Sequence, residues 1–552
     1  MAASFGRRLR RASAWPSRAL ASLNTTPSER LLIAPQDIRT ADPAIATEIY
    51  SGYFAFAGKI VNARGRSPFE VESGSPDWQR SLCGFSWLRH MRAANTALAR
   101  ANARALVDDF LSGVGSAKEE SAWELRVVIR RTLSFLAQSP IILEGADATF
   151  YRRYMRGLQR SQHFLEHQIA AGVVGESRLF TAIALAELGL CMKTTAKFQR
   201  WSTKLLADEL EAQVLPDGGH VSRNPQTLID LMFDLLPLRQ AYAARAAAAP
   251  AQLLNAIDRI LPMLRLLRHG DGTLALFNGM GLTAPDLLAT VLAYDDARAS
   301  ALNNAPHTGY FRIEALDTVL IVDAGPPPAP VFSTHAHAGC LAFEFSIGLQ
   351  RLVVNCGAAD VARKNAREAA RMTAAHSTLV VADTSSCRFA GQSGLERLLE
   401  GEILYGPRQV EAMREEQAER SILSLSHDGY VSPFGIIHER RLALDANGSR
   451  LDGYDSLRPV AGRTKTKPVD FAVRFHIHPA IALKLVRDGQ AVLLHLPDES
   501  SWLFDAQELV IDIEESIFFA AADGPHACGQ IVIYGRTDTL MDIGWTFRRL
   551  DE

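Results

Sequence analysis

The sequence has little cysteine, and its cysteines lack the spacing of a metal or disulfide scaffold. Six cysteines are scattered along 552 residues without a CxxC pair. This pattern excludes a zinc ribbon and a dense disulfide framework as the basis of the fold. We therefore expect buried thiols in a reducing compartment. A single bridge between Cys340 and Cys356, which flank one predicted hairpin, stays open.

Strong net charge and long apolar runs are also missing. The formal net charge is −2, which argues against a dedicated nucleic-acid-binding protein. No segment approaches the roughly 20 uninterrupted apolar residues of a transmembrane helix. The first 28 residues contain five arginines and no acidic residue, and they lack the apolar core of a secretory signal. We expect no nucleic-acid partner, no membrane span and a flexible basic arm over residues 1–40. The expected compartment is the cytoplasm, with the periplasm or cell envelope as the alternative.

The sequence does contain two regions with different apolar periods. In ELRVVIRRTLSFLAQ, residues 124–138, apolar residues recur every three or four positions, as in an amphipathic helix. From about residue 303, segments such as YFRIEALDTVLIVDAG, CLAFEFSIG, VDFAVRFHIHP and GQIVIYG have the alternation and the composition of strands. We predict an α+β multidomain protein, with a bundle or ring of helical hairpins over residues 41–302 and an antiparallel β-sandwich of stacked sheets over residues 303–552.

The stretch FSTHAHAGCLAFEFSIG, residues 332–348, places two histidines one residue apart ahead of an alternating run. On an extended backbone His335 and His337 would project the same way. Two hairpin-linked strands and a returning third would bring His337, Asn355 and His376 together at one end of a sheet. Histidine titrates near neutral pH, so this cluster is a candidate for proton transfer, and two histidines with an oxygen ligand would also suit Zn²⁺. A plain strand entrance is the alternative.

Arginines accompany this histidine cluster. Arg363, Arg367 and Arg371 recur every four residues, so a helix would carry them as one basic stripe. Guanidinium groups bind carboxylate or sulfate oxygens through two parallel hydrogen bonds. The stripe therefore predicts an anionic substrate, although a solvated basic helix would have the same pattern.

A loop between two predicted helices, LPDGGHVSRNP at residues 215–225, offers His220, Arg223 and Asn224. Loops held by a rigid scaffold commonly carry function, whereas the glycine-rich turn would equally suit a simple helix connection. The loop contains no phosphate-binding or dinucleotide fingerprint.

Several motifs, taken in order, resemble the heparinase II/III family of polysaccharide lyases, and they span most of the chain. They are GFSWLRHMRAA, LPDGGHVSRNPQTLIDLMFDLLPLR, HAHAGCLAFEFSIG, LVVNCG, RMTAAHSTLVV, RRLALDANGSRLDGYDSL, RFHIHP and GQIVIYG. The resemblance implies an α/α toroid, an incomplete helical barrel, followed by the β-sandwich. It also implies β-elimination on a uronic-acid polysaccharide, such as a glycosaminoglycan, alginate or an exopolysaccharide, in a cleft between the two. That reaction requires the enolate-like charge to be stabilised in place.

By the same resemblance, the HAH and AHST motifs give catalytic roles to His337 and His376, with Arg371 beside them. His337, Asn355 and His376 also correspond to the zinc-binding positions of the zinc-containing relatives, which carry an aspartate near Asn355. A neutral amide is a poorer ligand than a carboxylate. Zinc is accordingly the one cofactor that the sequence suggests, and Asn355 weakens the suggestion.

The helical half departs from the family pattern. Active relatives carry an Asn-His pair where this chain has Glu176 and Ser177, and a tyrosine where it has Gln226 and Thr227. The groups that would neutralise the carboxylate and supply the acid are thus absent from their expected places.

Two classes of function therefore stay open. One is a lyase with a rearranged site, in which His220, Arg223 and Asn224 act from the loop and Tyr310 or another tyrosine is the acid. The other is a polysaccharide-binding or envelope-assembly protein that has lost catalysis. The sequence leaves the oligomeric state open, an oligomer included.

Overall fold

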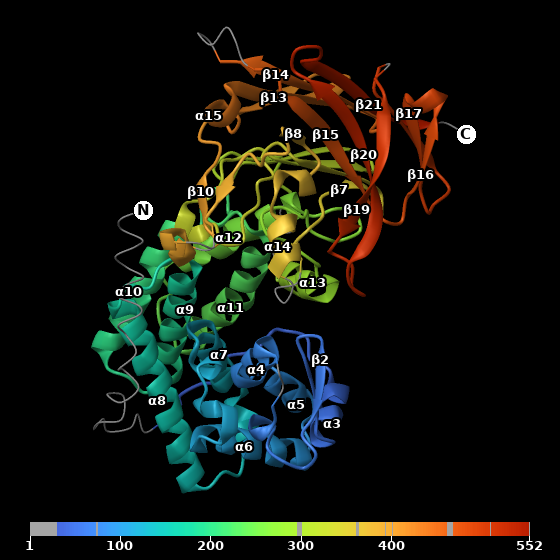
Figure 1. Ribbon diagram of the computed structural model, residues 1–552. Coiled ribbons are helices and arrows are strands. Elements are labelled where there is room, and N and C mark those ends of the chain that lie inside the picture. Colours follow the sequence, from blue (N-terminus) through green and yellow to red (C-terminus); the bar gives the residue numbers. More distant parts are fainter. Residues whose placement is uncertain are drawn as a thin grey trace. The chain divides into compact units, whose positions relative to one another are not determined.

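The protein is described by a computed structural model over most of its length (Figure 1). The described residues are 30–72, 75–294, 301–359, 364–391, 394–399, 401–460, 467–507 and 509–550. Most of the predicted basic arm, residues 1–29, lies outside them, as does Arg363 of the predicted arginine stripe. No helix in these ranges is long and apolar enough to cross a membrane.

Contacts divide the chain into two compact units, which we call the helical unit and the strand unit. The helical unit contains the described residues of Met1–Gln213, Asp230–Ile257 and Ala289–Tyr294. The strand unit contains those of Val214–Ile229, Asp258–Leu288 and Asp295–Glu552. The division does not follow the predicted boundary at residue 303, because two segments from the helical half of the sequence pack with the strands.

The helices of the first half follow one another with short connections. Their bounds are α3 (Pro43–Tyr50), α4 (Pro76–Gly84), α5 (Leu88–Ala94), α6 (Ala97–Ser112), α7 (Leu125–Leu143), α8 (Ala148–Ala170), α9 (Glu176–Cys191), α10 (Ala196–Gln213), α11 (Pro225–Ala244), α12 (Ala251–Leu266) and α13 (Pro285–Ala293). A small hairpin, β1 (Tyr53–Phe56) and β2 (Lys59–Asn62), lies between α3 and α4. Helix α7 packs against both α8 and α9 (Figure 1).

Local sequence explains where these helices form. The apolar period that predicts a helix over residues 124–138 corresponds to α7, in which Val128, Leu136 and Ile142 are fully buried. Asp147 begins α8, because its carboxylate accepts hydrogen bonds from the backbone N–H groups of Thr149 and Phe150 at 2.8 Å. Such a cap satisfies donors that the first turn of a helix leaves without partners.

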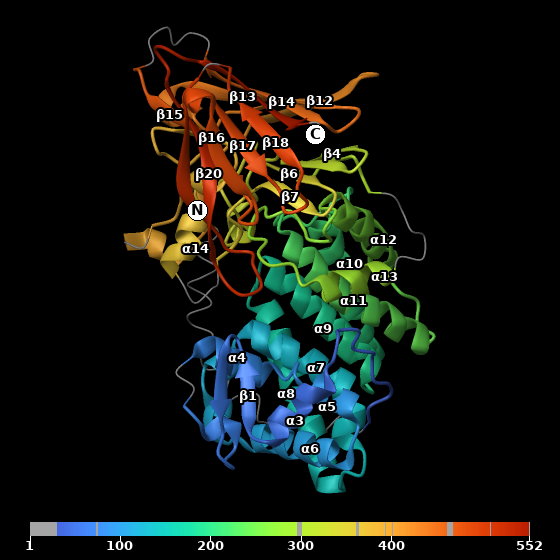
Figure 2. The same ribbon diagram turned by 90° about the vertical axis from the view of Figure 1, so that its right-hand side faces the viewer.

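The second half forms two large antiparallel sheets. In the nine-stranded sheet the order is β19-β20-β15-β7-β6-β5-β4-β3, with β8 also pairing with β15; in the eight-stranded sheet it is β11-β12-β13-β14-β21-β18-β17-β16 (Figure 2). The strands are β3 (Asn304–Ala305), β4 (Tyr310–Ala315), β5 (Thr318–Asp323), β6 (Phe343–Ile347), β7 (Gln350–Val354), β8 (Leu379–Val381), β11 (Val410–Glu416), β12 (Arg420–His427), β13 (Ile436–Asp445), β14 (Arg450–Pro459), β15 (Asp470–Ile477), β16 (Ala482–Val486), β17 (Ala491–His495), β18 (Ser501–Asp505), β19 (Ile511–Phe518), β20 (His526–Arg536) and β21 (Asp542–Leu550). Two short strands, β9 (Arg388–Phe389) and β10 (Ile403–Tyr405), pair separately, and the helices here are α14 (Lys364–Ala370) and α15 (Val431–Phe434).

The two large sheets share one apolar core. Phe343 of β6 stacks on Trp545 of β21 with ring centroids 5.6 Å apart, and Phe475 of β15 meets Phe547 of β21 edge-on at 5.7 Å. Contacts between the inner faces of two sheets define a β-sandwich. Four residues that the sequence predicts to point into this sandwich do belong to its core, namely Leu341, Phe343, Phe345 and Ile347.

The backbone around the two adjacent histidines differs from the prediction. Strand β6 begins only at Phe343, and residues 333–342 form turns and irregular chain. His335 and His337 therefore do not alternate along a strand: His335 is half-buried, whereas His337 is buried. Gly339 allows the chain to approach His376 closely, because a Cβ at this position would lie only 3.1 Å from the ring of His376.

All six cysteines are free thiols, and five of them are buried. The bridge between Cys340 and Cys356 that the sequence left open is not formed.

Candidate functional site

The strand unit brings four of the predicted site residues, Arg223, Tyr310, Asn355 and His376, into two connected clusters. The first, which we call the arginine network, comprises Arg223, Asn278, Tyr310 and Asp323. The second, which we call the histidine network, comprises His269, Glu344, Arg351, Asn355 and His376. All nine side chains are buried.

All three guanidinium nitrogens of Arg223 form hydrogen bonds inside the protein. Its Nε donates to the carbonyl of Thr308 at 2.7 Å, and one terminal nitrogen donates to the carbonyls of Gly325 and Pro326 at 2.9 and 3.0 Å. The other terminal nitrogen forms an ion pair with Asp323. These bonds use four of the five N–H donors of the guanidinium. The two parallel N–H groups needed to pair with the carboxylate of a substrate are therefore not free.

Tyr310, the predicted acid, is equally engaged. Its hydroxyl donates to the carbonyl of Arg223 at 2.5 Å and accepts a hydrogen bond from Nδ2 of Asn278 at 2.8 Å. Burial raises the pKa of Tyr310, and the neighbouring Arg223 only partly offsets this effect. Burial likewise raises the pKa of Asp323, against the opposing effect of Arg223.

The other two loop residues have clear structural roles. His220 is buried, and its Nδ1 lies 2.8 Å from the hydroxyl of Ser222. Asn224 precedes α11, and its side-chain oxygen accepts a hydrogen bond from the backbone N–H of Gln226 at 2.9 Å. Asparagine at this position, followed by proline at the first helical position, is a favourable helix start.

Because these side chains bond to one another, little open space is left between them. The hollow lined by His220, Arg223, Asn224 and Tyr310 has essentially no volume that a water-sized molecule could occupy. Small-molecule sites typically enclose ~300–1,000 Å³. The hollow is therefore smaller than a typical ligand site.

The histidine network orients His376. Nδ1 of His376 lies 3.3 Å from Oδ1 of Asn355, and that same oxygen accepts the backbone N–H of Ser377 at 3.0 Å. The side-chain amide of Asn355 donates to Oε1 of Glu344 at 3.0 Å. Since Oδ1 of Asn355 can only accept, Nδ1 of His376 carries the proton and Nε2 carries the lone pair.

Glu344 anchors this network as a buried carboxylate. It accepts hydrogen bonds from Nε2 of His269 at 2.9 Å and from Arg351 at 2.6 Å. Burial alone would raise the pKa of Glu344, but Arg351 and the hydrogen bond from His269 outweigh burial and hold the pKa at about 2.

His337 and His376 form a buried pair with ring centroids 5.1 Å apart. Nδ1 of His337 and Nε2 of His376 have no hydrogen-bond partner among the described residues. Burial lowers the pKa of both rings, to about 3 for His376, so both are neutral near pH 7. The structure therefore brings together the three predicted residues His337, Asn355 and His376, with two ring nitrogens left unbonded.

These residues supply a poor set of zinc ligands. The side-chain oxygen of Asn355 already accepts from Ser377 and His376, so the set offers two free nitrogens and no carboxylate. Within the described ranges, no three or more His, Cys, Asp or Glu side chains are grouped to hold a metal. Zinc binding stays a prediction.

The predicted arginine stripe is wrong for Arg371. Helix α14 ends at Ala370, and Arg371 turns inward, where its guanidinium donates to the carbonyls of Ser333, Ala336 and Gly401 at 2.8–2.9 Å. Burial lowers its pKa to about 10. Arg367 stays half-buried on α14, so the two arginines do not form one exposed face.

Sequence reasoning missed the residues that connect the clusters. Asn278 donates to both Tyr310 and Asp323 and accepts the backbone N–H of His337 at 3.3 Å. Its only sequence signal is the Asn-Gly pair in FNGMG, since Asn278 has a φ of 48°, a conformation that asparagine tolerates better than most residues. Glu344 lies in β6, whose sequence has the pattern of an ordinary buried strand. The presence of an ionisable side chain in that buried strand was the only signal for its role.

Comparisons with known proteins agree with this architecture. The family model Heparinase II/III-like, C-terminal matches residues 297–546. The chain is 34% identical over 515 residues to FtsZ-localized protein C of Caulobacter vibrioides, which covers 92% of this chain and 87% of the relative.

Solved structures show the same fold at low identity. The heparan sulfate lyase HepC of Pedobacter heparinus superposes with a TM-score of 0.62 and 14% identity, over 99% of this chain and 87% of that one. A heparinase III structure gives a TM-score of 0.71 and 12% identity, over 96% and 88% of the two chains. The fold is thus a helical toroid followed by an antiparallel β-sandwich, as predicted, and it is the scaffold of polysaccharide lyases. The chain belongs to the heparinase II/III-like family.

Proposed function

We propose that this protein uses the lyase scaffold as a non-catalytic assembly module and that its partner is FtsZ, the protein after which its relative is named. The observation that carries the proposal is the internal engagement of Arg223 and Tyr310. The two groups expected to neutralise a uronate and to supply a proton are both bonded within the protein.

The relatives support a partner of this kind. The chain shares 34% identity with a protein named for its localisation with FtsZ, across 92% of its length. The lyases share only 12–14% identity with it. We propose the cytoplasm as its compartment, which cell fractionation tests.

Purified full-length protein and FtsZ provide the direct test. We expect immobilised FtsZ to retain the protein with saturable binding. In parallel, the ultraviolet absorbance of unsaturated uronates is followed during incubation with a panel of uronic-acid polymers, and we expect no rise. Absence of FtsZ binding together with an absorbance rise would refute the assembly proposal.

A lyase remains the second candidate, because one observation favours it. His335 of the HAH motif is half-buried, so it is the member of the motif that a polymer can reach, while His337 and His376 lie beneath with unbonded ring nitrogens. If any polymer gives an absorbance rise, His335→Ala should abolish it. Retained activity in Tyr310→Phe would exclude Tyr310 as the acid.

A further inference from the structure

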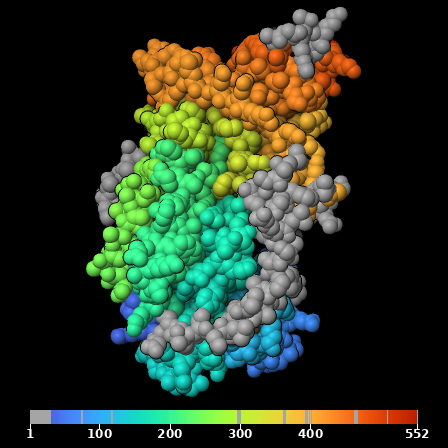
Figure 3. All heavy atoms as spheres, turned by 90° about the vertical axis from the view of Figure 1, so that its left-hand side faces the viewer, coloured from blue at the N-terminus to red at the C-terminus, as the bar shows by residue number. Residues whose placement is uncertain are grey.

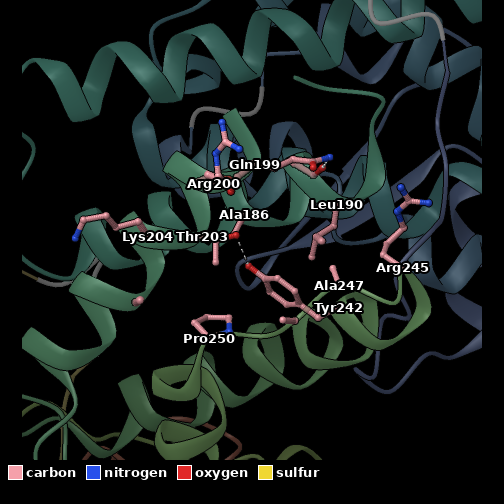
Figure 4. A pocket seen from close by; sticks show the side chains of 14 residues that line it. Ala186, Leu190, Gln199, Arg200, Thr203, Lys204, Tyr242, Arg245, Ala247 and Pro250 are labelled. Carbon is pink, nitrogen blue, oxygen red and sulfur yellow. Dashed lines mark hydrogen bonds between the residues drawn. The ribbon is translucent and has the colours of Figure 1, made fainter. Parts of the chain in front are cut away.

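A second hollow, in the helical unit, belongs to neither network. It lies between α9, α10 and the chain that joins α11 to α12 (Figure 4). Its volume is about 470 Å³, within the ~300–1,000 Å³ of typical small-molecule sites. Figure 3 shows the face of the helical unit that carries α8 and α10, in teal and green.

The charged side chains that line this hollow are all basic. Arg200, Lys204 and Arg245 line it, and no acidic side chain does. Lys204 is neutralised by Asp208, at 2.8 Å on the same helix. Within the described part of the chain, the guanidinium groups of Arg200 and Arg245 have no ion-pair partner, and both residues are exposed. Two unpaired guanidinium groups at one hollow attract phosphate or carboxylate oxygens.

The hollow also offers a hydroxyl donor. The hydroxyls of Tyr242 and Thr203 lie 2.9 Å apart, with Lys204 and Arg245 on opposite sides of this pair (Figure 4). One proton of the pair forms the hydrogen bond between them, and the second remains for a third group. Tyr242 is buried and held by α10, so this donor has a fixed position.

The C-terminal end of α9 does not cancel this attraction. The C-terminal end of a helix carries a partial negative charge of about half an elementary charge, and α9 ends beside the hollow at Cys191. However, the carbonyl of Gly189 already accepts hydrogen bonds from Gln199 at 3.1 Å and Thr194 at 3.3 Å. Arg200 and Arg245 are two full charges, so the hollow stays attractive to anions.

We propose that this hollow binds a small organic anion, a phosphate- or carboxylate-bearing molecule of the size of a sugar, between Arg200 and Arg245. The apolar side chains of Leu190 and Pro250 line the same hollow and contact the body of the ligand. This site is independent of FtsZ binding and of lyase activity.

Isothermal titration of the full-length protein with glucose 6-phosphate, glucuronate and glucose tests the proposal. We expect saturable one-to-one binding of the phosphate, the carboxylate or both, and none of neutral glucose. The first two arms identify which oxyanion is preferred. Failure of both anions to bind, or equal binding of glucose, would overturn the proposal.

Variants locate the binding. The double variant Arg200→Ala with Arg245→Ala should lower the affinity for the anion at least about tenfold, because two charge-assisted hydrogen bonds are removed. Ala247→Trp should block binding by filling the hollow, without changing any charge. Arg156→Ala, at an exposed position of α8 outside the hollow, is the matched control and should bind as the wild type does. Unchanged affinity in both the double variant and the filled variant would contradict the assignment.

Discussion

At the scale of single residues, buried neutral histidines are the most consequential groups of the strand unit. Burial lowers the pKa of His376 to about 3 and that of His476 to about 4, below the usual 6.5. As the pH falls below about 6.5, the unfolded chain takes up protons that the folded chain refuses. These histidines therefore contribute stability that is fully present above pH 6.5 and is lost as the pH falls towards 3.

His376→Asn provides a test of this linkage. Each such histidine adds about 1.4 kcal/mol per pH unit to the slope of unfolding free energy against pH. The variant should reduce that slope by about this amount between pH 5.5 and 4, as measured by urea unfolding. Phe345→Leu, a buried change without a titrating group, should lower stability but keep the slope. An unaltered slope in His376→Asn would contradict the neutral, buried state of the ring.

Glu344 allows a second prediction at this scale. Glu344→Gln leaves Arg351 buried without its carboxylate, and breaking a buried ion pair in this way costs about 3–5 kcal/mol. Because the pKa of Glu344 is held at about 2, its contribution is present above about pH 4.5 and is lost as the pH falls towards 2, so the variant should be less sensitive to acid in that window. Urea unfolding at pH 7 and pH 3 measures both effects. Glu411→Gln, at an exposed position of β11, should change neither.

The candidate site shows why sequence reasoning reaches only part of such a cluster. Motifs brought His337, Asn355 and His376 to attention, and they do lie together. The bonds of Arg223 could not be predicted, because its partner Asp323 is 100 residues away and no local pattern encodes that distance. The turn before β6 was missed for a similar reason, since the alternation of the sequence extends past the point where the strand begins.

At the scale of elements, the periodic pattern was a good guide. Helices such as α7 and strands such as β15 have strong periods and lie where the sequence predicts them. Pairing between distant strands was not predictable, because register depends on contacts such as that of Gly453 in β14 with Trp545 in β21. A Cβ at Gly453 would overlap the indole ring of Trp545, so this strand position requires glycine.

Gly453→Ala should therefore destabilise the sandwich by about 1–3 kcal/mol, the usual effect of overpacking. It should also disturb the hydrogen bond from Trp545 to Asp455, which measures 2.8 Å. Thermal unfolding measures the first effect, and tryptophan fluorescence of the folded state reports the second. Gly84→Ala in α4 is the control, because its Cβ would make only an ordinary contact at 3.6 Å. Equal stability of the two variants would argue against the close approach of Gly453 and Trp545.

At the scale of the whole molecule, the strand unit is not a continuous stretch of sequence. Residues 214–229 and 258–288 belong to it, and they supply Arg223, His269 and Asn278 to partners on β4, β5 and β6. The fragment 301–552 lacks these partners and leaves Asp323 and Glu344 buried with unmet hydrogen bonds.

We expect the fragment 301–552 to be poorly folded although it contains every strand of the sandwich. Circular dichroism and binding of a hydrophobic dye compare it with the full chain. The longer fragment 214–552 keeps the missing partners and should show more native strand signal. A cooperative thermal transition in the shorter fragment, equal to that of the full chain, would contradict the shared architecture.

The ion pair of Arg223 and Asp323 also bears on how this protein could have diverged from its relatives. Replacing either residue alone leaves the other as a buried charge without its ion-pair partner. Replacing Asn278 or Tyr310 alone removes hydrogen bonds from the same buried cluster. Residues in one network have strongly non-additive effects. Any mutational path that frees Arg223 for a substrate must pass through destabilised intermediates or change several residues together. The present arrangement of the network is therefore hard to reverse in evolution by single substitutions.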